Sequence, residues 1–162
     1  MDVGTTLIGI AILLMIIIPL VIINRKKKKL EAQFLQSFLF LGEKNNNRIT
    51  IYDVWNKSAI GIDKINHKLF YLQRTAVEDF TIEIDLSSIQ KSRVVSINLT
   101  MNGQSVTDKI SLVLAYRDKN LTEKVLEFYN NETDDLNLNG EIQLADKWLK
   151  IINSDIADIK HV

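Results

Sequence analysis

Cysteine is absent from this sequence, proline occurs once, and histidine occurs twice, as His67 and His161. Without cysteine there is no disulfide, thiolate nucleophile, cysteine-ligated metal, or palmitoyl or lipoprotein anchor. His67 falls in a predicted hairpin turn and His161 is the penultimate residue, so neither has a recognisable catalytic or metal partner. Glycine-rich phosphate loops, nucleophile elbows and paired His-Glu motifs are also missing from the sequence. We therefore predict no cofactor, no metal and no catalytic residue.

Neither sign of charge is in excess over the whole chain, because 20 Lys and Arg balance 20 Asp and Glu. The distribution is uneven. Through Arg48 there are seven basic and three acidic residues, a net charge of +4, and from Ile49 there are thirteen and seventeen, a net charge of −4. Nucleic acids bind basic surfaces, so an acidic domain argues against a nucleic-acid partner. Glu132, Asp134 and Asp135 lack the ligand spacing and turn glycine of a calcium loop, which predicts a solvated loop.

A long apolar run opens the chain. From Val3 to Asn24 there is no ionisable side chain, and most residues are Ile, Leu, Val or Met. A bilayer core about 30 Å thick is crossed by about 20 helical residues, so we predict a transmembrane anchor over residues 1–24. The alternative, a cleaved signal peptide, would begin with basic residues and end at a small-residue cleavage site. The sequence has neither feature.

Five consecutive cations end the apolar run, namely Arg25, Lys26, Lys27, Lys28 and Lys29. Lys and Arg accumulate on the cytoplasmic flank of membrane spans. This pattern predicts a single-pass protein of the inner membrane, with the N-terminus outside and the C-terminal domain in the cytoplasm. The predicted partners at this end are the lipid bilayer, through residues 3–24, and anionic headgroups, through the five cations at about 1 kcal/mol each.

Residues 25–48 are predicted to form this basic stop, a short juxtamembrane helix and a hinge. Leu30 to Leu41 carry apolar residues at helical spacing. Gly42 and the three asparagines from Asn45 then favour a helix end and a flexible connection. The helix could lie in the membrane interface, pair with another helix or pack on the following domain, and the sequence leaves these three alternatives open.

From residue 49 the apolar period changes from helical to alternating. The clearest strand is "FTIEIDL", in which Phe80, Ile82, Ile84 and Leu86 share one face. Seven short strands joined by polar turns, one of them at Asn102-Gly103, predict an antiparallel sandwich or barrel. The stretches that carry this pattern are "ITIYDVW", "SAIGID", "KLFYLQ", "FTIEIDL", "SRVVSINLTM", "KISLVLAYR" and "KVLEFYN".

The helical period returns after residue 140. Ala145, Trp148, Leu149 and Ile152 lie on one apolar face of a predicted amphipathic helix. A single helix after seven strands most economically closes one open end of the barrel. Lys147 and Lys150 fall on its outer face.

The order of these elements resembles a bacterial pleckstrin-homology-like (PH-like) domain between Ile49 and about Ile156. The resemblance is carried by the strand "SAIGID", the piece "IDLSSIQKSRVVSI" and the closing helix "EIQLADKWLKIIN". It implies a scaffold for a ligand or partner, without catalytic residues of its own. Phosphoinositide-binding members carry several cations in the first inter-strand loop, whereas Asn56-Lys57-Ser58 has one. This departure argues against recognition of inositol lipids.

The sequence thus predicts a mainly β protein. Its parts are a transmembrane helix (1–24), a basic stop with a juxtamembrane helix (25–48), and a seven-stranded antiparallel PH-like barrel or sandwich closed by a C-terminal helix (49–162). The predicted function is a membrane-anchored scaffold that presents this domain to an unknown protein partner. The alternatives are an enzyme with a site built from scattered acidic residues, and a lipid-sensing module.

Overall fold

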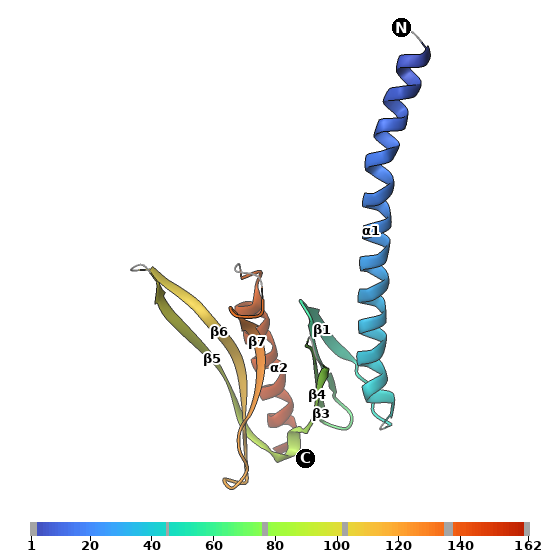
Figure 1. Ribbon diagram of the computed structural model, residues 1–162. Coiled ribbons are helices and arrows are strands. Elements are labelled where there is room, and N and C mark those ends of the chain that lie inside the picture. The colour runs from blue at the N-terminus through green and yellow to red at the C-terminus, as the bar shows by residue number, and fades with distance from the viewer. Residues whose placement is uncertain (1–2, 45, 76–77, 102–103, 135–137, 161–162) are drawn as a thin grey trace. The chain divides into compact units, whose positions relative to one another are not determined.

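The computed structural model describes residues 3–44, 46–75, 78–101, 104–134 and 138–160, without the side chains of residues 3–11, 14, 20, 27, 101 and 104. The chain divides into two compact units, Met1–Phe40 and Leu41–Val162, and each is described by itself. We call the second the β unit. Figure 1 shows the order of the elements, in which a long helix precedes seven strands and a closing helix.

Helix α1 (Val3–Lys44) is continuous over 42 residues. The sequence predicts two helical segments separated by the basic run, but Arg25 to Lys29 continue the helix, because Lys and Arg are good helix formers. Near the end of the helix, the carbonyl of Gly42 accepts the N–H of Asn47 at 3.0 Å. A Cβ added to Gly42 would lie 3.0 Å from Cγ1 of Ile49, so this close approach favours glycine.

The predicted membrane anchor is not found. In the part of the chain that the structure describes, no helix has both the length and the apolar character needed to cross a membrane. Crossing the hydrocarbon core takes about 20 predominantly apolar helical residues. The prediction of a transmembrane helix over residues 1–24 is therefore wrong, and so is the predicted single-pass localisation in the inner membrane with its N-out orientation.

The β unit contains seven antiparallel strands in two sheets, which confirms the mainly β prediction. Sheet A has the order β1-β2-β3-β4 and sheet B the order β5-β6-β7, so within each sheet every strand pairs with its neighbours in sequence. Short turns join the strands, as the polar segments between the apolar runs predict. The strands are β1 (Ile51–Trp55), β2 (Ser58–Asp63), β3 (Lys68–Arg74), β4 (Asp79–Asp85), β5 (Ile89–Met101), β6 (Gln104–Tyr116) and β7 (Lys124–Asn130).

The sheets do not close into a barrel, so of the two predicted alternatives, a barrel or a sandwich, the closed barrel is not found. Among the described residues, no backbone ladder joins sheet A to sheet B. At one junction the short helix η1 (Leu86–Ser88) carries the chain from β4 to β5 without pairing these strands. At the other, the indole Nε1 of Trp55 in β1 donates to the carbonyl of Phe128 in β7 at 2.9 Å. In a closed barrel β1 and β7 would pair through their backbones, whereas here a side-chain hydrogen bond joins them.

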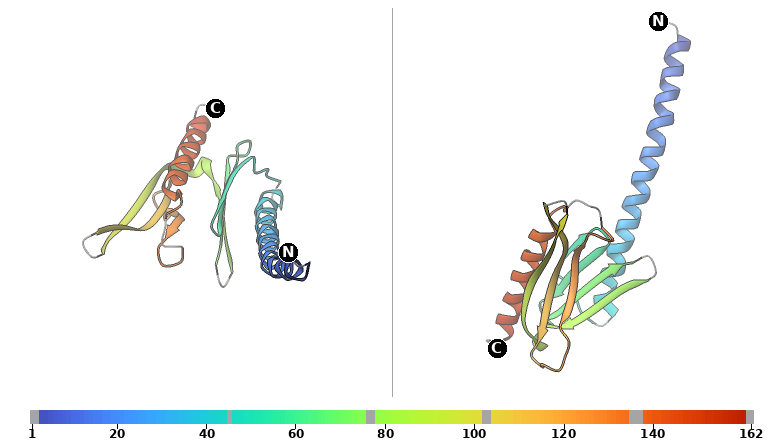
Figure 2. Two further views of the ribbon diagram at one scale, coloured as in Figure 1. Left: turned by 90° about the horizontal axis from the view of Figure 1, so that it is seen from above. Right: turned by 60° about the vertical axis from the view of Figure 1, so that its left-hand side comes forward.

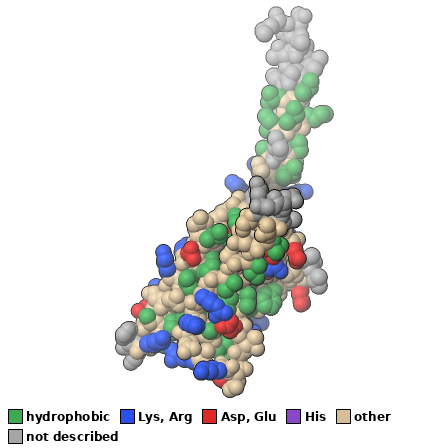
Figure 3. Space-filling model, turned by 90° about the vertical axis from the view of Figure 1, so that its left-hand side faces the viewer, with side chains coloured by type: hydrophobic (Ala, Val, Ile, Leu, Met, Phe, Trp, Pro, Cys, Tyr) green, Lys and Arg blue, Asp and Glu red, His purple; other side chains and the backbone are tan. Residues whose placement is uncertain are grey.

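The hairpin of β5 and β6 is the longest, with 13 residues in each strand. Strand β7 pairs with β6 only from Lys109 to Leu114, so the far part of the hairpin is two-stranded. There Leu99 and Val106 lie directly opposite each other, and both are exposed. Figure 3 shows the side on which sheet B lies, where apolar side chains are scattered among charged ones. The predicted Asn102-Gly103 turn lies outside the described residues.

Helix α2 (Glu141–Lys160) lies between the two sheets in Figure 1 and in the left-hand view of Figure 2. Its apolar face joins the main core, to which both sheets contribute. Ala145, Trp148 and Ile152 are fully buried, and Leu149 packs half-buried against them. Burying this face is favourable by roughly 25 cal/mol for each Å² of apolar surface removed from water. The helix is therefore an integral layer of the β unit.

Strand β4 follows the predicted alternation only toward its end. Ile84 and Leu86 are buried, Ile82 is half-buried, and Phe80 is 50% exposed. Phe80 pairs with Gln73 near the open end of sheet A, where the strand has passed beyond the core. The pattern identified the correct face but not where burial along that face stops.

Candidate functional site

A polar pocket of about 360 Å³ opens where the β1–β2 turn, the end of β3 and the end of β7 come together. Both sheets and the turn after β7 contribute to its wall. A smaller hollow shares the turn residues Lys57, Thr133 and Asp134 and extends the pocket toward Asn56. The lining residues of the pocket are Lys57, Ser58, Gln73, Arg74, Thr75, Glu127, Thr133 and Asp134.

Glu127, on β7, is tied to sheet A. Its carbonyl oxygen accepts a hydrogen bond from the hydroxyl of Tyr71 at 2.6 Å, and its Oε1 accepts one from Nε2 of Gln73 at 3.2 Å. Its Oε2 accepts a third from Nδ2 of Asn130 at 3.0 Å. Because Tyr71 and Gln73 belong to β3, these bonds fix one wall of the pocket across the two sheets.

Asp134 is positioned by the tight turn that follows β7. Its Oδ2 accepts the backbone N–H of Asn130 at 2.9 Å, and its own N–H donates to the carbonyl of Asn130 at 2.9 Å. The side-chain Oδ1 of Asn130 accepts the N–H of Glu132 at 3.1 Å. Asn and Asp favour such turns because their side chains bond to nearby backbone groups. Asn130 thus orients both pocket carboxylates.

Tyr71 does not line the pocket, but its hydroxyl bonds to the carbonyl of the lining residue Glu127. Burial raises the pKa of the Tyr71 hydroxyl far above its usual value, and the nearby charges of Glu127 and Asp134 raise it further. A negative charge that disfavours tyrosinate equally disfavours any anion at the same place. The charges of Glu127 and Asp134 therefore disfavour an anion near the Tyr71 hydroxyl.

Two cations of sheet A and its turn also line the pocket. Lys57 is exposed in the two-residue β1–β2 turn, and Arg74 at the end of β3 makes two hydrogen bonds to Asp79, at 3.1 and 3.3 Å. Asn56, with a backbone φ of 44°, donates from Nδ2 to Oε1 of Glu141 at the start of α2, at 3.3 Å. The turn that carries Lys57 is thereby anchored to the helix.

The pocket thus offers carboxylates, an amide, hydroxyls and cations to a ligand. In the residues that the structure describes, no group of three or more His, Asp or Glu is placed to hold a metal ion. The arrangement is suited to hydrogen bonding and charge recognition of a polar group.

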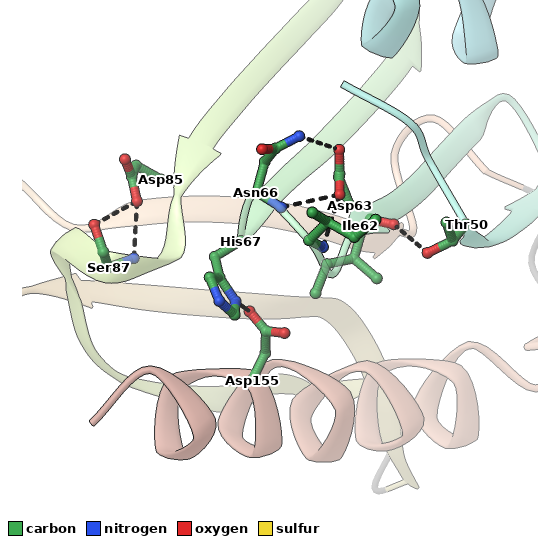
Figure 4. A network of polar contacts seen from close by, with 9 residues as sticks. Thr50, Ile62, Asp63, Asn66, His67, Asp85, Ser87 and Asp155 are labelled. Atoms are coloured by element: carbon green, nitrogen blue, oxygen red, sulfur yellow. Dashed lines mark hydrogen bonds and ion pairs between the residues drawn. The ribbon is translucent and has the colours of Figure 1, made fainter. Parts of the chain in front are cut away.

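A second polar cluster, drawn in Figure 4, lies at the turn between β2 and β3. Asp63 accepts the backbone N–H groups of Arg48 (2.7 Å), Ile65 (2.8 Å) and Asn66 (3.1 Å) and the Nδ2 of Asn66 (2.8 Å). His67 follows in this turn, and its Nδ1 lies 2.9 Å from Oδ2 of the buried Asp155 on α2. This cluster fastens the β2–β3 turn to the preceding segment and to the closing helix.

The residues predicted on the closing helix lie together in the core, as described above. Trp148 has in addition a polar partner that the sequence did not suggest, because its Nε1 donates to Oδ2 of Asp53 on β1 at 2.8 Å. Lys147 is not a purely solvated residue either. Its Nζ lies 2.6 Å from the same Asp53 oxygen, although half of its side chain is exposed.

The five predicted headgroup-binding cations, Arg25 to Lys29, lie on helix α1 in the first unit. Four of them have exposed side chains, and that of Lys27 is not described. Their contact with anionic groups stays a prediction from the sequence. They are not part of the pocket, which is lined by residues of the β unit.

Sequence reasoning missed the pocket residues. Asp134 was predicted to belong to a solvated loop, and Asp135 and His161 lie outside the described residues. His67 lies in a turn, as predicted, and contacts Asp155, a partner that the sequence did not indicate. A usable indication was present at Glu127, which interrupts the apolar run of β7 with a charge. Its partners come from elsewhere in the chain and could not be read from that interruption.

No family model, no curated protein and no solved structure matches this chain.

Proposed function

We propose that residues 49–162 form a PH-like binding module that engages a protein partner through the polar pocket. The four-plus-three arrangement of strands followed by a helix with an inward Trp148 supports the PH-like assignment. The absence of a backbone ladder between the sheets, among the described residues, departs from a closed barrel. The observation that carries the proposal is the pocket itself, whose polar groups converge from both sheets.

The pocket is built for recognition because the protein holds its polar groups in place. Tyr71 and Gln73 bind Glu127 across the sheets, and Asn130 binds both carboxylates. A site with fixed side chains loses less conformational freedom on binding, which favours affinity. Exposed residues at the mouth, Lys57 and Thr133, are available to a partner that covers the pocket.

Photocross-linking in the full-length chain tests the proposal. A benzophenone amino acid placed at Lys57 or Thr133 is expected to cross-link one defined protein in cells, and the same group at the exposed Lys150 of α2 serves as the control position. The cross-link should disappear when Glu127→Gln and Asp134→Asn are combined with the probe at Lys57. Equal labelling from Lys150, or labelling that survives the double substitution, would refute partner binding at the pocket.

A second candidate function is an enzyme, because Glu127 and Asp134 converge in one pocket and paired carboxylates can serve as general acid and base. A panel of ester, amide and glycoside substrates separates the two functions. Hydrolysis that is lost in both Glu127→Gln and Asp134→Asn, with the cross-link from Lys57 unchanged, favours the enzyme. Loss of the cross-link without any hydrolysis in the parent chain favours the binding module.

A further inference from the structure

Among the charged residues of the lining, Lys57 is exposed, whereas Arg74, Glu127 and Asp134 are half-buried. Ser58, at 6% exposure, lies deepest, and the side chains of Glu127 and Asp134 are half-buried. Lys57, by contrast, is exposed on the β1–β2 turn. A ligand that enters the pocket therefore passes a cation at the mouth and meets carboxylates farther in.

The two carboxylates, Glu127 and Asp134, make no ion pair within the described residues. In the described part of the chain, the groups that donate to them are neutral: the side-chain amides of Gln73 and Asn130 and the backbone N–H of Asn130. The guanidinium of Arg74, on the same lining, makes an ion pair with Asp79. Half-buried carboxylates interact more strongly with a counter-charge than exposed ones, because water screens them less.

The effect of Glu127 and Asp134 on Tyr71 gives independent support, since both charges raise the pKa of that hydroxyl in addition to the effect of burial. The two carboxylates thus act on one hydroxyl, which is bonded to the lining residue Glu127. The size of the pocket also limits the ligand. A volume of about 360 Å³ lies at the small end of ligand sites, which span roughly 300–1,000 Å³, and it admits one long side chain.

We infer that the pocket binds an organic cation, the guanidinium of arginine or the ammonium of lysine, carried on a side chain of the protein partner. This inference rests on the proposed binding function and names the chemistry of the ligand. The cation hydrogen-bonds to Glu127 and Asp134, and such charge-assisted bonds are about twice as strong as neutral ones. Lys57 at the mouth repels a second cation and favours an acidic residue next to the bound one.

Titration of the isotope-labelled full-length chain, followed by amide NMR shifts, tests the inference. The probes are N-acetyl-arginine amide and N-acetyl-lysine amide, and the neutral control is N-acetyl-citrulline amide, which keeps the shape of arginine without its charge. Saturable shifts at Gln73, Asn130 and Thr133 are expected with the two cations, with dissociation constants on the order of millimolar. Citrulline is expected to bind at least about fivefold more weakly. Equal affinity for citrulline and arginine would overturn the inference.

Variants locate the site and identify the source of the cation. Glu127→Gln and Asp134→Asn are each expected to weaken binding of the arginine probe at least about fivefold, whereas Glu132→Gln, the same change in the same turn outside the lining, should leave it unchanged. Thermal unfolding of each variant excludes misfolding as the cause. Spermidine tests a free polyamine as the source, and tighter binding of spermidine than of either amino-acid probe would overturn the assignment to a partner side chain. If the cross-link from Lys57 persists while no cation binds, the inference fails and the proposed function survives.

Discussion

The indole N–H of Trp148, a side chain with no exposed surface, donates a hydrogen bond to the carboxylate of Asp53 at 2.8 Å. The two residues are 95 positions apart and belong to α2 and to β1, the edge strand of sheet A. Since the apolar face of α2 also packs in the core with residues of sheet B, this bond makes the helix a link between the two sheets. One position of α2 therefore both buries the ring of Trp148 and gives its Nε1 a hydrogen-bond partner.

Replacing Trp148 by Ala should therefore destabilise the β unit strongly. Loss of a buried aromatic ring typically costs about 3–5 kcal/mol, out of a total stability of about 5–15 kcal/mol for a small domain. Urea denaturation followed by the fluorescence of Trp55, the one tryptophan that remains, measures the effect. Lys150→Ala, on the exposed side of the same helix, is the control and should change stability by no more than roughly 0.5 kcal/mol.

Trp148→Phe distinguishes the contribution of ring burial from that of the hydrogen bond to Asp53. The substitution keeps most of the apolar burial but removes the donor to Asp53, and an intramolecular hydrogen bond contributes about 0.5–1.5 kcal/mol net. Lys147→Ala removes the other partner of Asp53, an ion pair on a half-exposed side chain, which is worth about 0–1 kcal/mol. A Trp148→Phe variant as stable as the parent would mean that the bond to Asp53 contributes nothing.

Trp148 and its contacts show which features of the structure the sequence predicts and which it does not. Apolar spacing predicted that Trp148 faces inward, since a helix has to bury one stripe against something. It did not predict Asp53 as the partner, because a single acidic residue in an edge strand has no periodic context. The same holds for His67 and Asp155, which are 88 positions apart, and for Glu127 and Gln73. Local patterns specify elements and faces, whereas the polar contacts that build the pocket depend on tertiary structure.

Acid should weaken the β unit through Asp63 and Asp85. Burial raises the pKa of each carboxyl, but hydrogen bonds outweigh it and lower both pKa values, with donors at Arg48 and Asn66 for Asp63 and at Lys68 for Asp85. A carboxyl whose pKa is lower in the folded state stabilises the fold above its unfolded pKa of about 3.9. That contribution is lost as the pH falls through the folded pKa.

The free energy of unfolding, measured in urea at pH 7, 5, 4 and 3, is therefore expected to be steady from pH 7 to about 5 and to fall below it. Asp63→Asn keeps the shape of the side chain and removes the charge. It should lower stability at pH 7 by about 1–3 kcal/mol and flatten the decline in acid. If the free energy of unfolding fell as steeply below pH 5 in Asp63→Asn as in the parent, Asp63 would not be responsible for the decline.

The contact between His67 and Asp155 should be energetically coupled. Asp155 is 2% exposed, and His67 Nδ1, 2.9 Å away, joins the β2–β3 turn to α2. Removing the imidazole leaves a buried carboxylate without this partner, which costs about 1–3 kcal/mol. A double-mutant cycle of His67→Ala and Asp155→Asn, measured by urea denaturation, is expected to give a coupling energy of about 0.5–3 kcal/mol.

His67 also adopts a positive φ of 52°, which Asn tolerates better than most residues. His67→Asn thus keeps the backbone preference while removing the imidazole. It should be more stable than His67→Ala yet less stable than the parent. If His67→Asn matched the parent, the turn conformation rather than the contact with Asp155 would account for the role of this residue.

Trp55 joins β1 to β7, two strands that belong to different sheets and do not pair. Trp55 stacks on Phe128, with ring centroids 4.6 Å apart and planes 17° from parallel, and its Nε1 donates to the carbonyl of the same residue at 2.9 Å. Aromatic pairs contribute about 0.5–1.5 kcal/mol beyond their buried area. Because no described backbone ladder joins the sheets here, this one residue supplies both the packing and the hydrogen bond.

Trp55→Phe should cost about 0.5–1.5 kcal/mol, since it keeps a stacked ring and loses the donor. Trp55→Ala should cost about 3 kcal/mol, the low end for buried aromatics, because Trp55 is only half-buried. Urea denaturation monitored by the fluorescence of Trp148 measures both variants. Tyr52→Ala, at a 41% exposed position in the same strand, controls for loss of an aromatic and should stay within roughly 0.5 kcal/mol. Equal losses in Trp55→Ala and Tyr52→Ala would show that the stacked pair does not hold the sheets together, and the wall that carries Glu127, next to Phe128, would then have to be fixed by Tyr71 and Gln73 alone.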